Sequence, residues 1–172
     1  MADQQFESAI TDEMRALIGV KGPETVSELT TTSVRMFARS VGYVDPAFYD
    51  EDAARERGYR SLPAPPGYLG TPVFNPADSD PTFGGRRGGG GFRSPYPLVL
   101  NGGTDIEYTG EQICAGDTLT SSTALASLNE RWSGALGVPM LIQVSETTYT
   151  NQNGRVVAIS RGTGISYPRP GD

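Results

Sequence analysis

The apolar residues in the first third of this chain recur with the spacing of helix faces. One stripe occupies every fourth position: Phe6, Ile10, Met14 and Ile18. A second stripe follows the i, i+3, i+4, i+7 pattern: Val34, Phe37, Ala38 and Val41. Gly19 and Gly42 come directly after the stripes and predict where the two helices end. Thr31 or Thr32 is expected to cap the start of the second helix, and a third, short helix is expected over residues 50–57.

From residue 104 onward the pattern becomes that of strands. The segments expected to be extended are residues 25–29, 105–109, 117–130, 139–150 and 155–167. In the last two segments apolar residues alternate with polar ones, as in Met140, Ile142 and Val144. The Asn153-Gly154 pair between them predicts a tight hairpin turn. Helices followed by long antiparallel strands predict an α+β fold.

Residues 62–103 contain most of the 13 prolines and about half of the 22 glycines. The run from Gly84 to Gly91 lacks the apolar side chains that a packed core requires. Neither flank has enough helices and strands to fold alone. We therefore predict one domain over residues 1–172, with residues 62–103 inserted into it as a loop rather than joining two domains.

Composition excludes several classes of function. The formal net charge of −6 argues against a nucleic-acid-binding face and against an electrostatic membrane binder. No apolar run approaches the length of a spanning helix, and the polar N-terminus does not resemble a signal peptide. The single cysteine, Cys114, excludes an intrachain disulfide and is expected to be buried. These features predict a cytoplasmic protein.

The chain contains no histidine. Histidine is the usual general base near neutral pH, so a Ser-His-Asp or Cys-His mechanism within this chain is excluded. A histidine-ligated metal is excluded for the same reason, and we expect neither a metal site nor a cofactor. Any proton transfer by this chain alone would fall to carboxylates, tyrosines or lysines. Asp105, Glu107, Glu111 and Asp117 are the carboxylates near the strands, but their spacing does not indicate a catalytic pair.

The segment from Phe37 to Asp50 reads FARSVGYVDPAFYD. It resembles the hydratase motif of the MaoC family, FA-x-x-x-G-D-x-N-P-x-H-x-D. Three later segments resemble the N-terminal dehydratase domain type of that family: residues 100–103, 115–119 and 146–154. The resemblance implies a single hot-dog fold, in which a curved antiparallel sheet wraps around a long helix. It also implies a role in hydrating trans-2-enoyl-CoA to 3-hydroxyacyl-CoA, with the CoA thioester as substrate.

The chain departs from the motif at both catalytic positions. Tyr43 stands where the family has its catalytic aspartate, and Phe48 stands where it has its catalytic histidine. Asp45 falls on the position of the family's asparagine. Phenylalanine transfers no proton, and an unperturbed tyrosine has a pKa near 10. The resemblance therefore implies a non-catalytic, acyl-pocket-forming subunit, paired as a heterodimer or heterotetramer with a MaoC-like catalytic chain. Heteromeric relatives that act on steroid side chains suggest a bulky acyl group.

Candidate contacts to the acyl-CoA follow from the motif and from the basic and glycine-rich residues: Tyr43, Asp45, Phe48, Tyr49, Arg86, Arg87, Arg93, Asn101 and Gly102. The motif residues have a second interpretation as a packed loop, and Trp132 is expected either in the core or at a partner interface. Three other functions stay open. They are a hot-dog acyl-CoA thioesterase using Asp45 or Glu107 as base, a non-enzymatic acyl-CoA-binding protein, and a homodimer with a structural role.

Overall fold

The computed structural model describes residues 6–73 and 92–169. Its helical elements are α1 (Asp12–Ala16), α2 (Thr31–Ser40), the 3-10 turn η1 (Pro46–Phe48) and α3 (Glu51–Glu56). Its strands are β1 (Thr25–Glu28), β2 (Thr71–Pro72), β3 (Leu98–Tyr108), β4 (Thr118–Ser133), β5 (Val138–Asn151) and β6 (Val156–Tyr167). No helix in the described ranges is long and apolar enough to cross a membrane.

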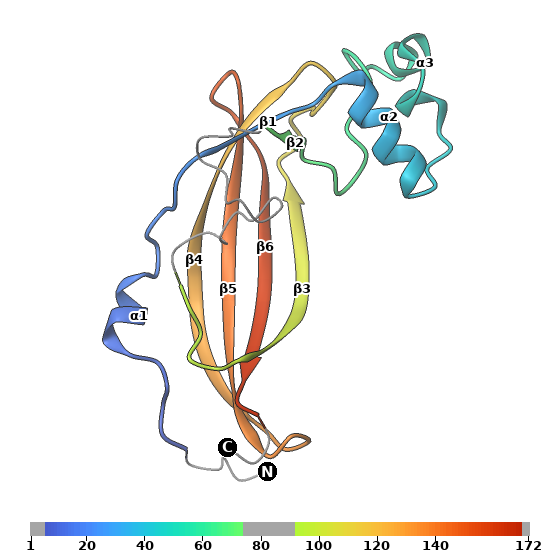
Figure 1. Cartoon of the computed structure of the whole chain (residues 1–172). Coiled ribbons are helices and arrows are strands. Elements are labelled where there is room, and N and C mark those ends of the chain that lie inside the picture. The colour runs from blue at the N-terminus through green and yellow to red at the C-terminus, as the bar shows by residue number, and fades with distance from the viewer. Residues whose placement is uncertain (1–5, 74–91, 170–172) are drawn as a thin grey trace.

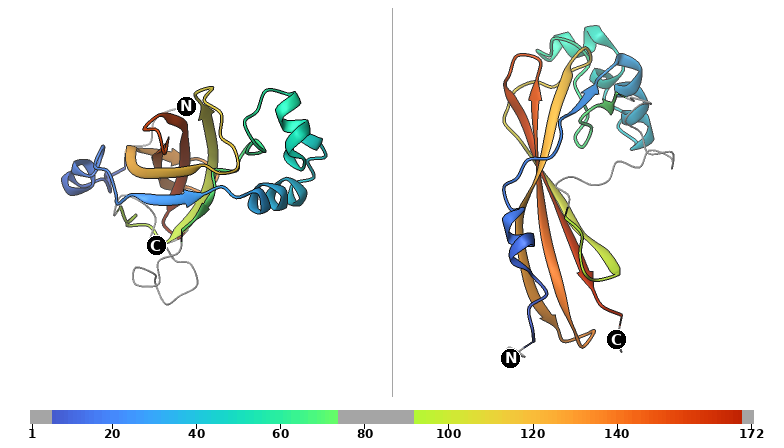
Figure 2. Two further views of the ribbon diagram at one scale, coloured as in Figure 1. Left: turned by 90° about the horizontal axis from the view of Figure 1, so that it is seen from above. Right: turned by 60° about the vertical axis from the view of Figure 1, so that its left-hand side comes forward.

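The six strands form one antiparallel sheet in the order β2-β1-β4-β5-β6-β3. The four long strands curl together into a half-barrel (Figures 1 and 2). β5 and β6 meet at a hairpin in which the Gly154 N–H donates to the Asn151 carbonyl at 3.0 Å. The predicted Asn-Gly turn and the predicted curved antiparallel sheet are therefore confirmed.

Helix α2 is ten residues long and lies at one end of the sheet rather than along it (Figure 1). Its N-cap is Thr30, one residue before the predicted cap. Thr30 and Ser33 each accept a hydrogen bond from the other's backbone N–H, at 3.1 and 2.9 Å. Val34 and Phe37 anchor the helix in the core. The predicted second helix is therefore present. It is short, however, and the sheet does not wrap along its length.

The predicted first helix is mostly not helical. Only Asp12–Ala16 forms α1, although the apolar stripe begins at Phe6. Two residues of the stripe nevertheless pack in the core: Ile10 and Met14, with the neighbouring Leu17, contact a cluster of buried leucines. Periodicity identified residues that pack, but tertiary contacts rather than a continuous helix hold them in place.

The residues that β4 and β5 contribute to the two buried clusters lie on one face of the sheet. The cluster nearer α2 includes Leu119 and Val157, with Tyr149 packed against it. The second cluster consists of Leu125, Leu128 and Leu141. Five partly buried side chains pack against it: Ile10, Met14, Leu17, Phe92 and Tyr96. The curvature of the sheet therefore encloses the core at two separate places.

The opposite face carries the alternating apolar residues of β5 noted in the sequence. Ile142 pairs with Ile165 across β5 and β6, and Val144 pairs with Thr163. Neither apolar residue of β5 belongs to a buried cluster of the described chain. The alternation thus predicted the strands correctly, while the described core lies on the other side of them.

The ends of the predicted insertion belong to the folded domain. Leu62 and Pro65 are fully buried, and Tyr68 stacks on Phe37 with ring centroids 4.9 Å apart. At the other end, β3 already begins at Leu98. The proposed boundaries 62 and 103 were therefore too wide, because proline- and glycine-rich sequence also packs against the core.

Candidate functional site

The hydratase-like motif forms the loop that connects α2 to α3. Asp45 caps η1, since its Oδ1 accepts a hydrogen bond from the Ala47 N–H at 3.0 Å. Its other oxygen, Oδ2, pairs with the Arg57 guanidinium. The Ala47 N–H and then Arg57 hold the pKa of Asp45 below its usual value. This carboxylate is ionised and occupied on both oxygens, so it serves the loop's structure.

The two positions of the missing catalytic pair face each other. The Tyr43 and Phe48 rings stack with centroids 5.5 Å apart and planes 30° apart. The Tyr49 hydroxyl donates to the Tyr43 carbonyl at 2.5 Å, and Arg35 Nε donates to the Tyr49 carbonyl at 2.9 Å. The structure therefore brings together the four predicted motif residues, in a loop fixed by hydrogen bonds and aromatic contact.

The other predicted contact residues lie elsewhere. Asn101 and Gly102 belong to β3, where the register shifts and Asn101 Oδ1 accepts from the Gly103 N–H at 2.9 Å. A Cβ at Gly102 would lie 2.7 Å from Thr163 Cγ2, so glycine permits close packing of β3 on β6. Arg93 is exposed, and Arg86 and Arg87 fall outside the described residues. Within residues 6–73 and 92–169, no hydrogen bond, ion pair or ring contact joins the motif residues to Asn101 or Arg93.

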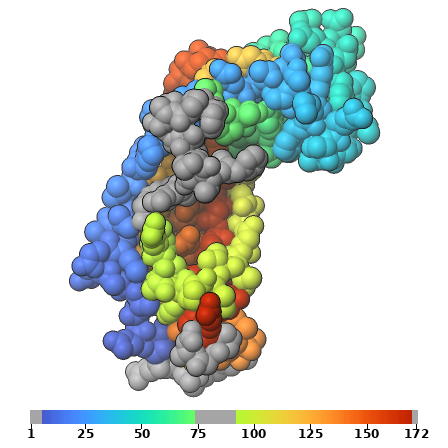
Figure 3. Space-filling model, viewed as in Figure 1, coloured from blue at the N-terminus to red at the C-terminus, as the bar shows by residue number. Residues whose placement is uncertain are grey.

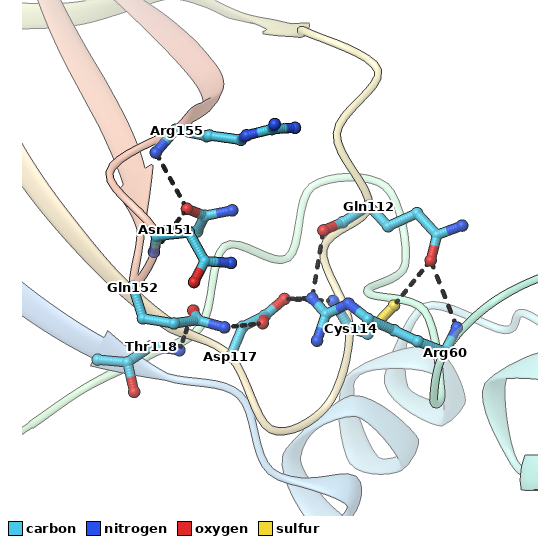
Figure 4. Close-up of polar contacts among 9 residues, drawn as sticks. Arg60, Gln112, Cys114, Asp117, Thr118, Asn151, Gln152 and Arg155 are labelled. Atoms are coloured by element: carbon cyan, nitrogen blue, oxygen red, sulfur yellow. Dashed lines mark hydrogen bonds and ion pairs between the residues drawn. The ribbon is translucent and has the colours of Figure 1, made fainter.

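A buried polar network that sequence reasoning did not identify lies at the hairpin end of the sheet (Figure 4). The Asp117 side chain is only 1% exposed and pairs with Arg60. It also accepts hydrogen bonds from Gln152 Nε2 and from the Cys114 N–H, both at 2.8 Å. These bonds tie the segment that follows α3 to the start of β4 and to the β5–β6 turn. The only sequence signal was the Ala-Gly-Asp marker at residues 115–117, which gives no hint of Arg60.

An open cavity of about 390 Å³ lies beside this network. It is lined by Arg60, Gly110, Glu111, Gln112, Asn151, Gln152 and Asn153. Glu111 is held by Arg155 at 2.5 Å, and Glu107 is held by Arg161 at 3.1 Å. With Asp117 bound by Arg60, three of the four carboxylates that the sequence analysis placed near the strands are ion-paired in the described structure.

Cys114 is buried, as predicted, and burial raises the pKa of its thiol. We expect its reaction with a disulfide reagent such as DTNB to be at least about a thousandfold slower in the native protein than in urea. The reason is that an opening free energy of about 4 kcal/mol leaves roughly one molecule in a thousand open. Because the chain has one cysteine, the released chromophore reports this site alone. Native labelling at the unfolded rate would contradict the buried placement.

Comparison with solved structures defines the class of fold. A chain of the ChsH1-ChsH2 complex from Mycobacterium tuberculosis aligns with a TM-score of 0.68 and 13% identity, covering 93% of this chain and 95% of that one. A chain of the C-terminally truncated HadBC (3R-hydroxyacyl-ACP dehydratase) complex from the same organism aligns with a TM-score of 0.61 and 20% identity, covering 87% and 97%. The (R)-hydratase of A. caviae involved in PHA biosynthesis aligns at 0.54 with 14% identity, covering 89% and 96%. The protein therefore has the hot-dog fold, as predicted.

Sequence comparison defines the family. Residues 16–160 match the model of the FAS1-like dehydratase domain region, and the chain belongs to this family. UPF0336 protein Franean1_6066 of Parafrankia sp. is 31% identical over 142 residues, covering 76% of this chain and 82% of the relative. UPF0336 protein SCO4636 of Streptomyces coelicolor is 28% identical over 118 residues, covering 66% and 72%. The names of these relatives state no activity.

Proposed function

We propose that this chain is the non-catalytic subunit of a heteromeric enoyl-CoA hydratase, which converts trans-2-enoyl-CoA to 3-hydroxyacyl-CoA. The observation that carries the proposal is the Tyr43–Phe48 stack at the two catalytic positions of the motif. Hydration requires one group to remove a proton from water and another to protonate the substrate carbon. Phenylalanine has no ionisable group and transfers no proton, and the ordinary pKa of a tyrosine, near 10, makes that side chain a poor proton acceptor at neutral pH.

The carboxylates of this chain do not replace the missing pair. Asp45 is bound by Ala47 and Arg57, and its pKa is lowered, which makes it a weaker base. Glu107 is ion-paired with Arg161 at 3.1 Å. The same two residues were the bases considered for a thioesterase. Their pairing favours a subunit that holds substrate over one that cleaves the thioester.

Two features support a role in shaping an acyl pocket. The loop backbone is fixed by the Tyr49 and Asp45 hydrogen bonds, which suits a surface that must keep its shape. Tyr43 and Val44 leave this surface apolar and accessible, with 37% and 89% of their areas exposed. A partner chain with an intact Asp/His motif would supply the acid–base pair across the junction. That two of the similar structures are the HadBC and ChsH1-ChsH2 complexes supports such a partner.

The test is an assay for hydration of crotonyl-CoA and of bulkier enoyl-CoA thioesters. The reaction is monitored through the loss of absorbance of the enoyl thioester. The chain is assayed alone and then mixed with a hot-dog chain that carries the intact G-D-x-N-P-x-H motif and is encoded beside it. We expect no hydration above the buffer rate by the lone chain, and turnover by the mixture. Release of free CoA by the lone chain would instead indicate a thioesterase. Tight CoA-ester binding without turnover in either sample would indicate a binding protein.

A further inference from the structure

The middle of β5 and β6 is polar on the face of the sheet that carries the buried clusters. At either end of this stretch β5 is apolar, because Leu141 belongs to one buried cluster and Tyr149 packs against the other. Between them, six residues of the two strands share this face, and we call them the polar floor: Gln143, Ser145, Thr147, Ser160, Gly162 and Gly164. The floor is about 13 Å long, at roughly 3.3 Å per residue along a strand.

The polar floor lies at the bottom of a recess. In Figure 3 the orange and red atoms of β5 and β6 are seen between β3 and the yellow-green segment that leads into it. A Cβ at Gly162 would meet no atom of the described chain within 4 Å, and Gly162 is not among the glycines with a positive φ. Neither the backbone nor the described neighbours therefore require glycine at this position. A glycine inside a strand often marks the close approach of a ligand or of another backbone.

The hydrogen-bonding groups of the floor are only partly used within the chain. The hydroxyls of Ser145 and Ser160 and the amide of Gln143 make no hydrogen bond with another described residue. The Thr147 hydroxyl shares one hydrogen bond with Thr123, at 2.8 Å, which uses one of the two hydroxyl protons and leaves the other. The side chains of the floor are half-buried. Donors and acceptors in the recess are thus available to a ligand.

The polar floor is also uncharged. The charged residues of the same stretch, Glu146 and Arg161, alternate with the floor residues and lie on the other face, where they form an ion pair at 2.8 Å. A carboxylate or phosphate on a ligand is typically bound by arginine or lysine, and the floor supplies neither. Its hydroxyl and amide groups instead match neutral oxygens, which are those of alcohols, ketones and similar groups.

We infer that the polar floor binds a neutral, oxygen-bearing part of the acyl group, so that the substrate class is an acyl thioester with hydroxyl or carbonyl oxygens along its chain. A purely alkyl chain would displace water from Ser145 and Ser160 without replacing its hydrogen bonds, which costs free energy. The inference rests on the proposed function, because it names the substrate class of the acyl pocket. The floor adjoins the motif through Tyr149, which packs against the cluster that includes Ala47.

The test compares matched acyl-CoA esters on the purified full chain. Isothermal titration calorimetry measures the Kd of hexanoyl-, octanoyl- and decanoyl-CoA and of their counterparts with a hydroxyl at the chain end. Saturated esters are used because they cannot be hydrated. We expect the hydroxylated ester to bind at least about tenfold more tightly in at least one pair, the size of one good hydrogen bond. An apolar pocket would give the opposite order, because burying a hydroxyl without a partner is unfavourable.

A pair of variants assigns the preference to the polar floor. Ser145→Ala/Ser160→Ala removes two hydroxyls that no described residue binds, so it should fold like the wild type and lose most of the preference. The matched control is Thr148→Val/Thr163→Val, which removes one hydroxyl from each of the same strands on the other face and should keep the preference. Circular dichroism establishes that the variants fold; if the alanine pair does not, Ser160→Ala alone replaces it.

Equal or tighter binding of the alkyl ester in every pair, or no binding of any ester, would overturn the inference. So would a preference that survives the alanine substitutions. The proposed function is tested separately, by hydration in the mixed subunits, and does not depend on which acyl group is preferred. Hydration by the lone chain would remove the proposed function but would leave the preference for hydroxylated esters unchanged.

Discussion

Asp117→Ala should unfold at a markedly lower urea concentration than the wild-type chain, with a loss of about 3 kcal/mol in the free energy of unfolding. The side chain is almost fully buried, and its removal leaves the Cys114 N–H, the Gln152 amide and Arg60 without their shared acceptor. Breaking a fully buried ion pair typically costs about 3–5 kcal/mol. The lower end applies because the Arg60 side chain is 46% exposed and recovers part of its hydration.

Two further variants separate charge from packing. Asp117→Asn keeps one acceptor oxygen and nearly the same volume, so we expect it to lose about half as much stability, roughly 1–2 kcal/mol. Glu111→Gln removes the neighbouring exposed ion pair with Arg155 and should cost less than about 1 kcal/mol. Tryptophan fluorescence follows unfolding, and DTNB reaction of Cys114 reports opening of the network itself. Equal losses in the free energy of unfolding for Asp117→Ala and Glu111→Gln would show that the buried network stabilises the fold no more than an exposed ion pair does.

In the proposed complex of this chain with a catalytic hot-dog chain, we expect substitutions in the partner's motif to lower the hydration rate far more than substitutions of carboxylates in this chain. Replacing the histidine of the partner's motif by alanine should lower kcat by about 10²–10⁴-fold, the usual contribution of a general acid or base. Asp45→Asn and Glu107→Gln in this chain should change kcat by no more than a few-fold. Both carboxylates are engaged by arginines rather than directed at a reacting centre.

Phe48→Ala in this chain provides the complementary measurement. The substitution removes the ring that stacks on Tyr43 and should raise KM, with a smaller change in kcat, because it alters an apolar wall rather than proton transfer. A loss of kcat for Asp45→Asn as large as that for the partner's histidine variant would contradict the assignment and move catalysis into this chain.

The sequence predicted the strands better than their environment. Alternation located β5 and β6 to within a residue or two, because a half-buried strand has a period of two whichever side is buried. It did not reveal that Leu141 and Tyr149, rather than Ile142 and Val144, face the buried clusters. The two-residue period alone does not show which face of the strand is buried. The choice of face depends on what lies across the sheet, and those contacts are distant in sequence.

Of the candidate site, the sequence predicted the motif loop but not the buried polar network. The motif loop was predictable because Tyr43, Asp45 and Phe48 are neighbours in sequence, and the loop closes through short-range bonds. The Arg60–Asp117 network was not, because its partners are 57 residues apart and join elements whose arrangement only the fold provides. The helix formed by the first apolar stripe was overestimated for a related reason. Packing on the sheet, rather than helical spacing, holds Ile10 against the leucine cluster.

We propose that this chain contributes to hydration as a subunit and not as a catalyst. The most direct measurement holds the catalytic hot-dog chain at a fixed concentration and titrates in this chain while the hydration rate of an enoyl-CoA is followed. We expect no hydration by this chain alone, and with the partner a hydration rate that rises and saturates at one stoichiometric equivalent. Full hydration by the purified single chain, or a partner rate that does not respond to this chain at all, would contradict it.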